Sequence, residues 1–364
     1  MSTHSATGAA PLGRRGRLFA RQPGLRHLLP HLLVPVYLAL GMALAYLGGF
    51  HRAEPHHLPV AVVGSSPPSA VLATTIGDRA GAQLAVRTVP DASTARAQVR
   101  AGTLTAAYLP GPGNPTVIVD SAASPSAAQV AETVFDQVAA TADRRLTVSD
   151  LEPLPATDLQ GSNLFFLLVA LTVGGYTAAA TLGVAGAAAR VPYWLRSLLG
   201  VLVAGVIAVL GVTVAEPVVG AVHGHFGELV LLAWLYVGGV ALFGSALHAF
   251  FGRLTTAVLV TLFVMLNFTS SGGVFDGRLQ AGVFSGLANV WNGSAFLRAG
   301  RGLLYRGGTG VGYGLWVLAG WLAAGVLLVA TAALVDRRRA ELAALATAYR
   351  QEAEQEELDE GVAA

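Results

Sequence analysis

Apolar residues in this chain are gathered into long runs separated by shorter polar segments. Several runs reach about 20 residues, the length that a helix needs to cross a hydrocarbon core of about 30 Å. Backbone amides in lipid must be satisfied within their own segment, so each run predicts a helix. The pattern predicts an α-helical polytopic membrane protein with six transmembrane helices, near residues 29–50, 163–186, 196–220, 228–251, 254–274 and 311–335.

Residues 51–162 have a different pattern, with short apolar stretches bounded by Pro and Gly. Four of these stretches are typical of strands, at 58–64, 82–90, 104–110 and 115–121. Helical stretches that begin with Ser, Asp or Pro lie between or after them, at 68–81, 91–102 and 124–146. This order predicts one compact α/β domain inserted after the first span. Residues 163–335 are then expected to form a transmembrane domain of five helices.

Composition supports a membrane protein and excludes several chemistries. Charged residues make up 12% of the chain, against about 25% in soluble domains, and the mean hydropathy is +0.59. All 23 basic residues are arginine, and without lysine the chain cannot form a GxxxxGK[ST] phosphate loop. Cysteine is absent, which excludes disulfides and thiolate metal sites. We therefore expect no enzyme activity and no cofactor, and any ATP hydrolysis must occur in a separate subunit.

Arginine placement predicts the orientation, because segments rich in arginine stay on the cytoplasmic side. Arginines precede the first span, lie between the second and third and between the fourth and fifth, and follow the sixth. A multi-pass protein of the plasma membrane is predicted, with a cytoplasmic basic tail (1–28), a cytoplasmic amphipathic acidic tail (336–364) and the α/β domain outside. We expect the first span to be an uncleaved anchor. Four arginines disagree with this orientation: Arg278, Arg298, Arg301 and Arg306.

The sequence shows no catalytic or metal-binding signature. Four carboxylates of the outer domain have no acid–base spacing and are expected on solvated surface, namely Asp78, Asp120, Glu132 and Asp136. The outer domain has seven arginines against ten acidic residues, which argues against nucleic-acid binding. No metal is expected, although five histidines lie near the outer face without the spacing of a recognisable site: His51, His56, His57, His223 and His225.

Ionisable residues are nearly absent from the predicted membrane domain. Its acidic residues are Glu216, Glu228 and Asp276, all near the ends of predicted spans. His248 lies about one turn from the inner end of the fourth span, where interfacial packing is expected. A proton-driven carrier normally has a carboxylate or histidine relay near mid-depth, so ion coupling within this chain is not expected.

The fifth span ends in an unusually polar stretch, LNFTSSGGVFDGRL at 266–279. Polar side chains and paired glycines weaken a helix, so residues 267–273 are predicted to unwind. Apolar residues at helical spacing from Val283 to Val290 predict one short helix, and a second is expected to start at Ser294 as its cap. Together they predict an outer re-entrant hairpin near 276–305 that acts as a gate. Its gate and hinge residues would be Asn267, Ser271, Gly272, Gly273, Phe275 and Arg298.

These residues resemble a known family. Ser271-Gly272-Gly273 with Phe275, followed by FSGLANVWNGSAFLRAGRGLLY at 284–305, is similar to a pattern in ABC-2 type transporter permeases, especially the YhgE/Pip-like branch. The matching positions in the second stretch are Ser294, Ala295, Leu297, Arg298, Leu304 and Tyr305. The layout of one span, an outer domain and five further spans is similar too. The chain departs from the pattern in having no proline after Pro217, where those relatives have prolines in the hairpin.

The resemblance implies a permease subunit that forms a homodimer or pairs with a related permease. It also implies a separate ATP-binding subunit and export of a lipid, a drug-like molecule or cell-envelope material. Coupling to the ATPase would use the cytoplasmic segment 187–197, with candidate residues Arg190, Tyr193, Trp194 and Arg196. The alternative from another class is a non-transporting membrane scaffold or secretion accessory whose outer domain binds a partner.

Overall fold

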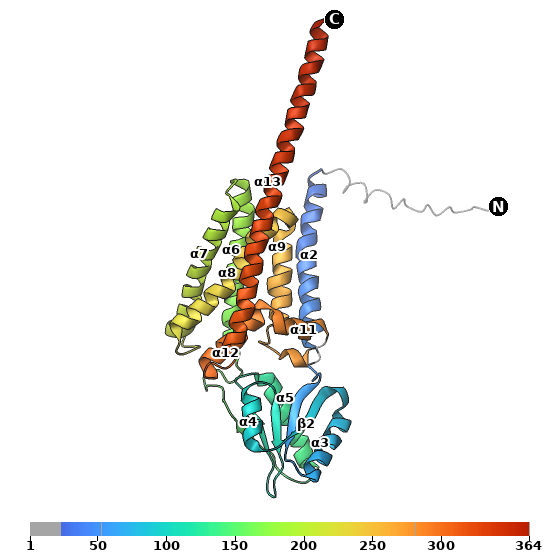
Figure 1. Cartoon of the computed structure of the whole chain (residues 1–364), viewed down its shortest axis with the longest axis vertical. Coiled ribbons are helices and arrows are strands. Elements are labelled where there is room, and N and C mark those ends of the chain that lie inside the picture. Colours follow the sequence, from blue (N-terminus) through green and yellow to red (C-terminus); the bar gives the residue numbers. More distant parts are fainter. Residues whose placement is uncertain (1–22, 52, 281, 364) are drawn as a thin grey trace, which may run out of the picture.

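The computed structural model describes residues 23–51, 53–280 and 282–363. A helical bundle forms one end of this part of the chain, and an α/β domain with a central sheet forms the other (Figure 1). The start of α2 and the end of the long α13 lie at the end of the bundle that points away from the sheet (Figure 1). Most of the predicted basic tail, residues 1–22, lies outside the described residues.

The bundle is built from one helix before the α/β domain and a series after it. The first is α2 (Pro23–Phe50). The later helices are α6 (Asn163–Ala188), α7 (Tyr193–Thr213), η2 (Val214–Val218), α8 (Phe226–Phe251), η3 (Gly252–Leu254), α9 (Thr255–Val260), η4 (Thr261–Leu266), α10 (Asn267–Ser270), η5 (Gly277–Leu279), α11 (Val283–Val290), α12 (Asn292–Tyr305) and α13 (Val311–Ala363).

Five helical segments within the described residues are long and apolar enough to cross a membrane: Leu32–Phe50, Asn163–Ala188, Tyr193–Val218, Phe226–Ser270 and Val311–Gln355. The chain is therefore a membrane protein. The predicted fourth span and most of the fifth, 254–274, fall within Phe226–Ser270. Gly252, with a left-handed φ of 49°, ends α8 inside this segment. Beyond it the chain continues into α9, which packs beside α8 (Figure 1).

Helix α8 is the centre of the bundle and packs against α6, α7, α12 and α13. Buried residues occur on all sides of it, as expected for a helix that is apolar all round. Small residues allow close approach: a Cβ on Gly244 would meet Ala179 of α6, and one on Gly325 of α13 would meet Leu242. These contacts are within one chain, so this part of the glycine and alanine pattern serves bundle packing.

Helix α2 is peripheral. It packs against η4 and α10, where Ala45 joins Val264 and Met265 in a small apolar cluster. The Tyr37 hydroxyl lies 2.6 Å from the Thr261 hydroxyl. The other faces of α2 expose large apolar side chains, including Leu33, Leu44 and Leu47. A surface of this kind fits hydrocarbon rather than water.

The α/β domain has a five-stranded sheet in the order β2-β1-β3-β4-β5. Its strands are β1 (Leu58–Val63), β2 (Leu84–Val89), β3 (Ala106–Leu109), β4 (Thr116–Val119) and β5 (Thr147–Asp150). Neighbouring strands are parallel, except that β3 and β4 are antiparallel. The four predicted strands are confirmed. The edge strand β5 was missed, because its sequence TVSD is short and largely polar.

Helices cover both faces of this sheet. Side chains at alternate positions, such as Val60 and Val62, pack with α3 (Pro67–Ala80) and α5 (Pro125–Ala140). The intervening positions, such as Ala61, pack with α4 (Ala92–Arg100). The predicted caps of two helices are confirmed: Asp91 accepts the Thr94 N–H at 2.8 Å, and Ser124 accepts that of Ala127 at 3.3 Å.

The core of the α/β domain also includes residues from the segment after α10. Leu279 is fully buried among side chains of the sheet and of α3 and α5, and Phe275 packs at the edge of the same cluster. The His56 N–H donates to the Arg278 carbonyl at 2.8 Å. The domain is therefore completed by a segment more than a hundred residues later in the chain.

Helix α13 continues far beyond the bundle (Figure 1). Its 53 residues correspond to about 80 Å, against a hydrocarbon core of about 30 Å. The predicted acidic tail is thus helical to Ala363 and continuous with the preceding span. Its residues from 340 to 355 are exposed along the whole length.

Replacing Leu279 with Ala should destabilise the α/β domain by about 2–5 kcal/mol, because it removes a fully buried side chain from the core. Hydrogen exchange of the β1 and β4 amides in the purified chain measures the effect. Val283→Ala is the control, because Val283 lies four residues away and is 73% exposed. Equal protection in the two variants would show that the segment does not stabilise the domain.

Candidate functional site

The fifth predicted span is short and irregular. It consists of α9, the π-helix η4 and α10, and its 16-residue length of Thr255–Ser270 covers about 24 Å at about 1.5 Å per residue. A π-helix changes the backbone pairing and is often found at functional positions. Here the Leu262 carbonyl of η4 accepts the Trp291 indole N–H at 3.1 Å. The irregular helix is thus joined directly to the hairpin that follows it.

A buried polar network holds the end of this segment; we call it the polar lock, formed by Thr172, Tyr236, Asn267 and the Gly293 N–H. Asn267 is fully buried; its amide donates to the Tyr236 hydroxyl at 2.9 Å, and its carbonyl accepts the Gly293 N–H at 2.9 Å. The Tyr236 hydroxyl lies 2.5 Å from that of Thr172. The polar lock joins α6, α8, α10 and α12.

Residues 267–270 do not unwind, which corrects the sequence-based expectation. They form α10, and their hydroxyl groups are satisfied by the helix itself: Thr269 donates to the Met265 carbonyl at 2.7 Å and Ser270 to that of Leu266 at 2.6 Å. Polar side chains that pair within the helix need no partner from water. The end of the span is polar because it is buried in protein, as membrane-embedded polar groups require.

The helix breaks at Gly272, which has a left-handed φ of 77°. Ser271 is buried just before it, accepts the Gly273 N–H at 3.2 Å and donates to the Phe268 carbonyl at 3.0 Å. A Cβ on Gly273 would collide with the ring of Phe165. Glycine is therefore required at these two positions for different reasons: the backbone conformation at Gly272 and close packing at Gly273.

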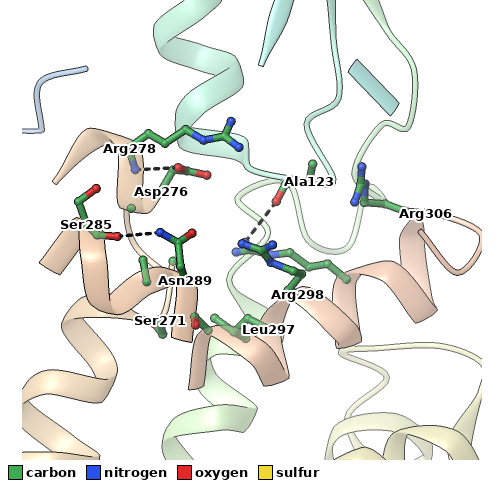
Figure 2. Close-up of a pocket in the computed structure, with 14 residues that line it drawn as sticks. Ala123, Ser271, Asp276, Arg278, Ser285, Asn289, Leu297, Arg298 and Arg306 are labelled. Atoms are coloured by element: carbon green, nitrogen blue, oxygen red, sulfur yellow. Dashed lines mark hydrogen bonds between the residues drawn. The ribbon is translucent and has the colours of Figure 1, made fainter. Parts of the chain in front are cut away.

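Helices α11 and α12 follow the break, and both were predicted. The second begins at Asn292 rather than at the expected cap Ser294, whose hydroxyl donates to the Trp291 carbonyl at 2.8 Å. Most of α12 is buried against α13, α8, α6 and α10, whereas α11 has no buried residue. The 276–305 segment is thus a packed layer between the bundle and the α/β domain (Figures 1 and 2). A re-entrant path through the membrane stays a prediction.

Two further gate candidates contact helices of the bundle. The Phe275 ring is 5.9 Å from that of Phe50, at the end of α2. The guanidinium of Arg298 lies on the ring of Tyr313, 4.6 Å from its centre. Gln280 connects the two sides of the helix break. It is buried, and its side-chain amide donates to the Thr269 carbonyl at 2.7 Å. Gln280 was not among the predicted site residues, and its importance depends on this contact across the helix break.

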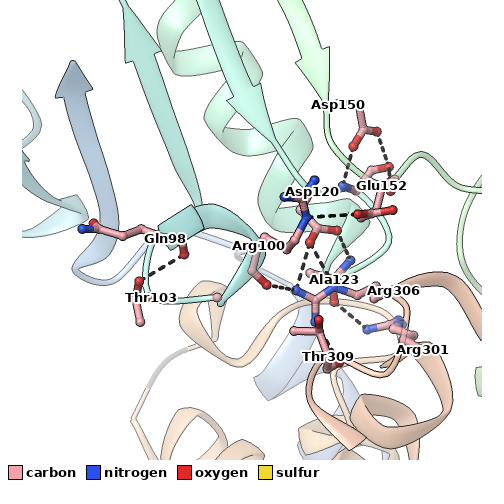
Figure 3. Close-up of polar contacts among 12 residues, drawn as sticks. Gln98, Arg100, Thr103, Asp120, Ala123, Asp150, Glu152, Arg301, Arg306 and Thr309 are labelled. Atoms are coloured by element: carbon pink, nitrogen blue, oxygen red, sulfur yellow. Dashed lines mark hydrogen bonds and ion pairs between the residues drawn. The ribbon is translucent and has the colours of Figure 1, made fainter. Parts of the chain in front are cut away.

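Arginines join this layer to the α/β domain. Arg278 donates to the Thr105 hydroxyl at 2.9 Å and to the Gly102 carbonyl at 3.2 Å. Arg306 forms a buried ion pair with Asp120 at 2.9 Å and donates to the Arg100 carbonyl at 2.7 Å (Figure 3). Arg278 and Arg306, two of the four arginines that disagreed with the charge rule, therefore serve contacts with the outer domain, which explains their position.

Asp120 corrects another expectation, because it was predicted on solvated surface and is only 5% exposed. Burial raises the pKa of the Asp120 carboxyl above its usual range, although the Arg306 guanidinium acts in the opposite direction. Removing one partner of such a pair leaves a buried charge without compensation. The other three carboxylates differ from it, with Asp78 and Asp136 exposed and Glu132 half-buried.

The coupling candidates lie at the opposite end of the bundle and divide into two pairs. Tyr193 and Arg196 are buried; the Arg196 guanidinium lies 4.7 Å from the Tyr193 ring centre, and its Nε donates to the Val191 carbonyl at 2.6 Å. Arg190 and Trp194 are exposed. A partner subunit could therefore contact the second pair directly, whereas the first pair positions the start of α7.

The five histidines are exposed: His51, His56, His57, His223 and His225. Three follow α2 and two lie in the connection between η2 and α8. No group of three or more metal-binding side chains lies together in the part of the chain that the structure describes. The five histidines are therefore not arranged as a complete set of metal ligands.

Comparison of the chain with known protein families, curated proteins and solved structures finds no match. The sequence and the geometry of this site are therefore the basis for a functional proposal.

Replacing Asn267 with Leu should lower the free energy of unfolding by about 1–3 kcal/mol, because the Gly293 N–H and the Tyr236 hydroxyl each lose a buried partner. Tyr236→Phe should also destabilise, and the double variant should cost less than the sum of the two. Tryptophan fluorescence during denaturant unfolding in detergent measures all three. Asn289→Leu is the control, because Asn289 is exposed on α11. Additive losses for the double variant would contradict the polar lock.

Proposed function

We propose that this chain is the permease subunit of an ABC-2 type exporter. It works as a homodimer or with a related permease, and a separate subunit binds and hydrolyses ATP. Its substrate is a lipid, a drug-like molecule or cell-envelope material. The observation that carries this proposal is the interrupted fifth segment, whose outer end is held by the polar lock and continues into the packed layer of α11 and α12. Such a broken helix over a bundle is a suitable gate.

The proposed topology has six crossings, with α8 and the α9–α10 segment counted separately. The ends of the described chain at α2 and α13 lie away from the α/β domain, which supports opposite sides of the membrane for the two (Figure 1). The proposal assigns both termini to the cytoplasm and the domain to the outside. The arginines after the sixth span, Arg337 to Arg339, agree with this orientation.

The energy source in this proposal is ATP rather than an ion gradient. Acidic residues between 163 and 335 are restricted to Glu216, Glu228 and Asp276. These lie in η2, at the start of α8 and after α10, near the ends of helices. An ion-coupled carrier normally has ionisable groups in the interior of its bundle.

The alternative function is a membrane scaffold or secretion accessory. The buried Asp120–Arg306 pair and the shared Leu279 core attach the outer domain firmly to the bundle, which also suits a fixed platform for a partner. A scaffold needs no ATPase, so the two functions differ in the subunit that accompanies the chain in native membranes.

The orientation is tested with single cysteines, since the chain has none of its own. Ser93→Cys, on the exposed surface of α4, should react with a membrane-impermeant thiol reagent in intact cells. Thr347→Cys, on the exposed tail of α13, is the matched control and should react only after lysis. The reverse pattern would contradict the proposed orientation.

The function is tested by purification of the tagged chain from native membranes. An ATP-hydrolysing subunit should accompany it, whereas the purified chain alone should show no ATPase activity. Combined Arg190→Ala and Trp194→Ala should reduce recovery of that subunit about tenfold, because loss of an interface aromatic residue commonly costs more than about 1.4 kcal/mol.

Trp316→Ala is the control for this experiment, because Trp316 is 80% exposed on α13 and Trp194 is 66% exposed on α7. Recovery should be unchanged in that variant. If no ATP-hydrolysing subunit accompanies the unmodified chain, the scaffold is favoured and the permease proposal fails.

A further inference from the structure

A cavity between the bundle and the α/β domain contains an unusual concentration of positive charge (Figure 2). Its volume is about 190 Å³, room for about six waters at the roughly 30 Å³ that each occupies in the liquid. We call it the arginine chamber, after the four arginines in its wall. Asp276 is the one carboxylate in that wall. The arginines are Arg278, Arg298, Arg301 and Arg306.

The charges of the arginine chamber are poorly balanced within the described chain. Of the four arginines, Arg306 alone has a carboxylate of the described residues within 4.0 Å, namely Asp120. The Asp276 carboxylate accepts the backbone N–H of Arg278 at 2.9 Å and forms no ion pair within that distance. The direct hydrogen-bond and stacking partners of the other three guanidinium groups are neutral, and the Asp276 and Asp158 carboxylates act on Arg301 only from beyond 4.0 Å. Arginine keeps its charge at any ordinary pH, so the excess cannot be removed by deprotonation.

Arg301 has the least satisfactory partners. It is 6% exposed, and two of its nitrogens reach the Ala123 and Gly161 carbonyls only at 3.5 Å. Its Nε has no hydrogen-bond partner among the described residues. Burial lowers the pKa of this guanidinium, which reflects the cost of keeping it charged there. A buried donor of this kind normally has a partner of opposite charge.

Arg298 has a different position in the same wall. Its side chain is exposed, and its guanidinium rests on the Tyr313 ring 4.6 Å from the centre. Stacking on an aromatic ring fixes the plane of the guanidinium and leaves its N–H edge available. Polar side chains of α11 and α12 also line the chamber, namely Ser285, Asn289 and Ser294.

We propose that the arginine chamber binds a phosphate-type oxyanion, with Arg298 and Arg301 as its principal contacts. Guanidinium groups donate paired hydrogen bonds that match phosphate oxygens, and three such groups suit an anion that carries more than one negative charge. The anion is either a soluble phosphate or the headgroup of a phospholipid, since both present the same oxygens. Binding at this place does not depend on transport or on an ATPase.

A purely structural role makes a different prediction. If the arginines only joined the two domains, phosphate would bind weakly and without saturation. Loss of any one arginine would then change stability alone. The two roles are separated by measuring binding and unfolding on the same variants.

The test uses the full chain purified in detergent. Isothermal calorimetry measures binding of inorganic phosphate, and separately of short-chain phosphatidic acid and of short-chain phosphatidylcholine, at constant ionic strength. One saturable site per chain is expected for inorganic phosphate, for phosphatidic acid or for both. Arg298→Gln should weaken it about tenfold, because a charged hydrogen bond contributes at least about 1.4 kcal/mol.

Arg298→Gln is the decisive variant, because its exposed side chain can be removed without opening the core; its unfolding temperature is recorded as a check. Arg301→Gln should weaken binding as well. Arg79→Gln, an exposed position at the end of α3, is the control and should bind normally.

Binding of inorganic phosphate supports a soluble ligand, and binding of phosphatidic acid alone supports a lipid headgroup. Absence of saturable binding for inorganic phosphate and for phosphatidic acid alike overturns the proposal, and so does binding of phosphatidylcholine as tight as that of phosphatidic acid. Equal weakening in Arg79→Gln and Arg298→Gln overturns it too, because the effect would then follow net charge rather than the arginine chamber.

Discussion

A hydrogen-bonding group buried in an apolar bundle must find its partner within the protein, and this constraint determines the arrangement at the end of the fifth segment. The Asn267 amide donates to the Tyr236 hydroxyl. The Tyr236 hydroxyl also pairs with that of Thr172, and the Asn267 carbonyl accepts the Gly293 N–H. Four helices are thereby fixed in relation to one another at one point. Apolar packing alone would allow several registers between these helices, whereas the polar lock is satisfied in one.

The second fixed point lies on the far side of the helix break. Gly272 redirects the chain, so that Leu279 enters the core of the α/β domain and Arg278 reaches Thr105 and Gly102. The later Arg306 then forms its buried pair with Asp120. The short stretch between the polar lock and Arg306 thus connects the interior of the bundle to the interior of the outer domain. A structural change in one domain would therefore be transmitted to the other through this stretch.

The sequence allowed good prediction of the elements and poor prediction of their long-range contacts. Apolar runs and turn residues predicted the helices, four of the strands and the two helices of the hairpin, because those signals are local. The partner of Asp120 is 186 residues away, and nothing near Asp120 distinguishes it from a solvated carboxylate. The same limit applies to the Tyr236 hydroxyl, whose partner Thr172 is 64 residues away. Asn267 was correctly predicted to be a site residue, but the predicted reason was wrong. Its side chain bonds buried partners and does not mark an unwound helix end.

Helix α12 links the polar lock to the arginine chamber. It offers the Gly293 N–H to Asn267 at its start, and it carries Arg298 and Arg301 on the following turns. A rigid helix cannot shift toward an anion at these arginines without moving the N–H that Asn267 needs. An anion that binds more tightly when α12 is shifted therefore favours the state in which the polar lock is broken. It shifts the balance between the two states by no more than the difference in its binding free energy for them. Loss of one buried hydrogen bond costs about 1–3 kcal/mol, a difference that one or two guanidinium contacts can supply.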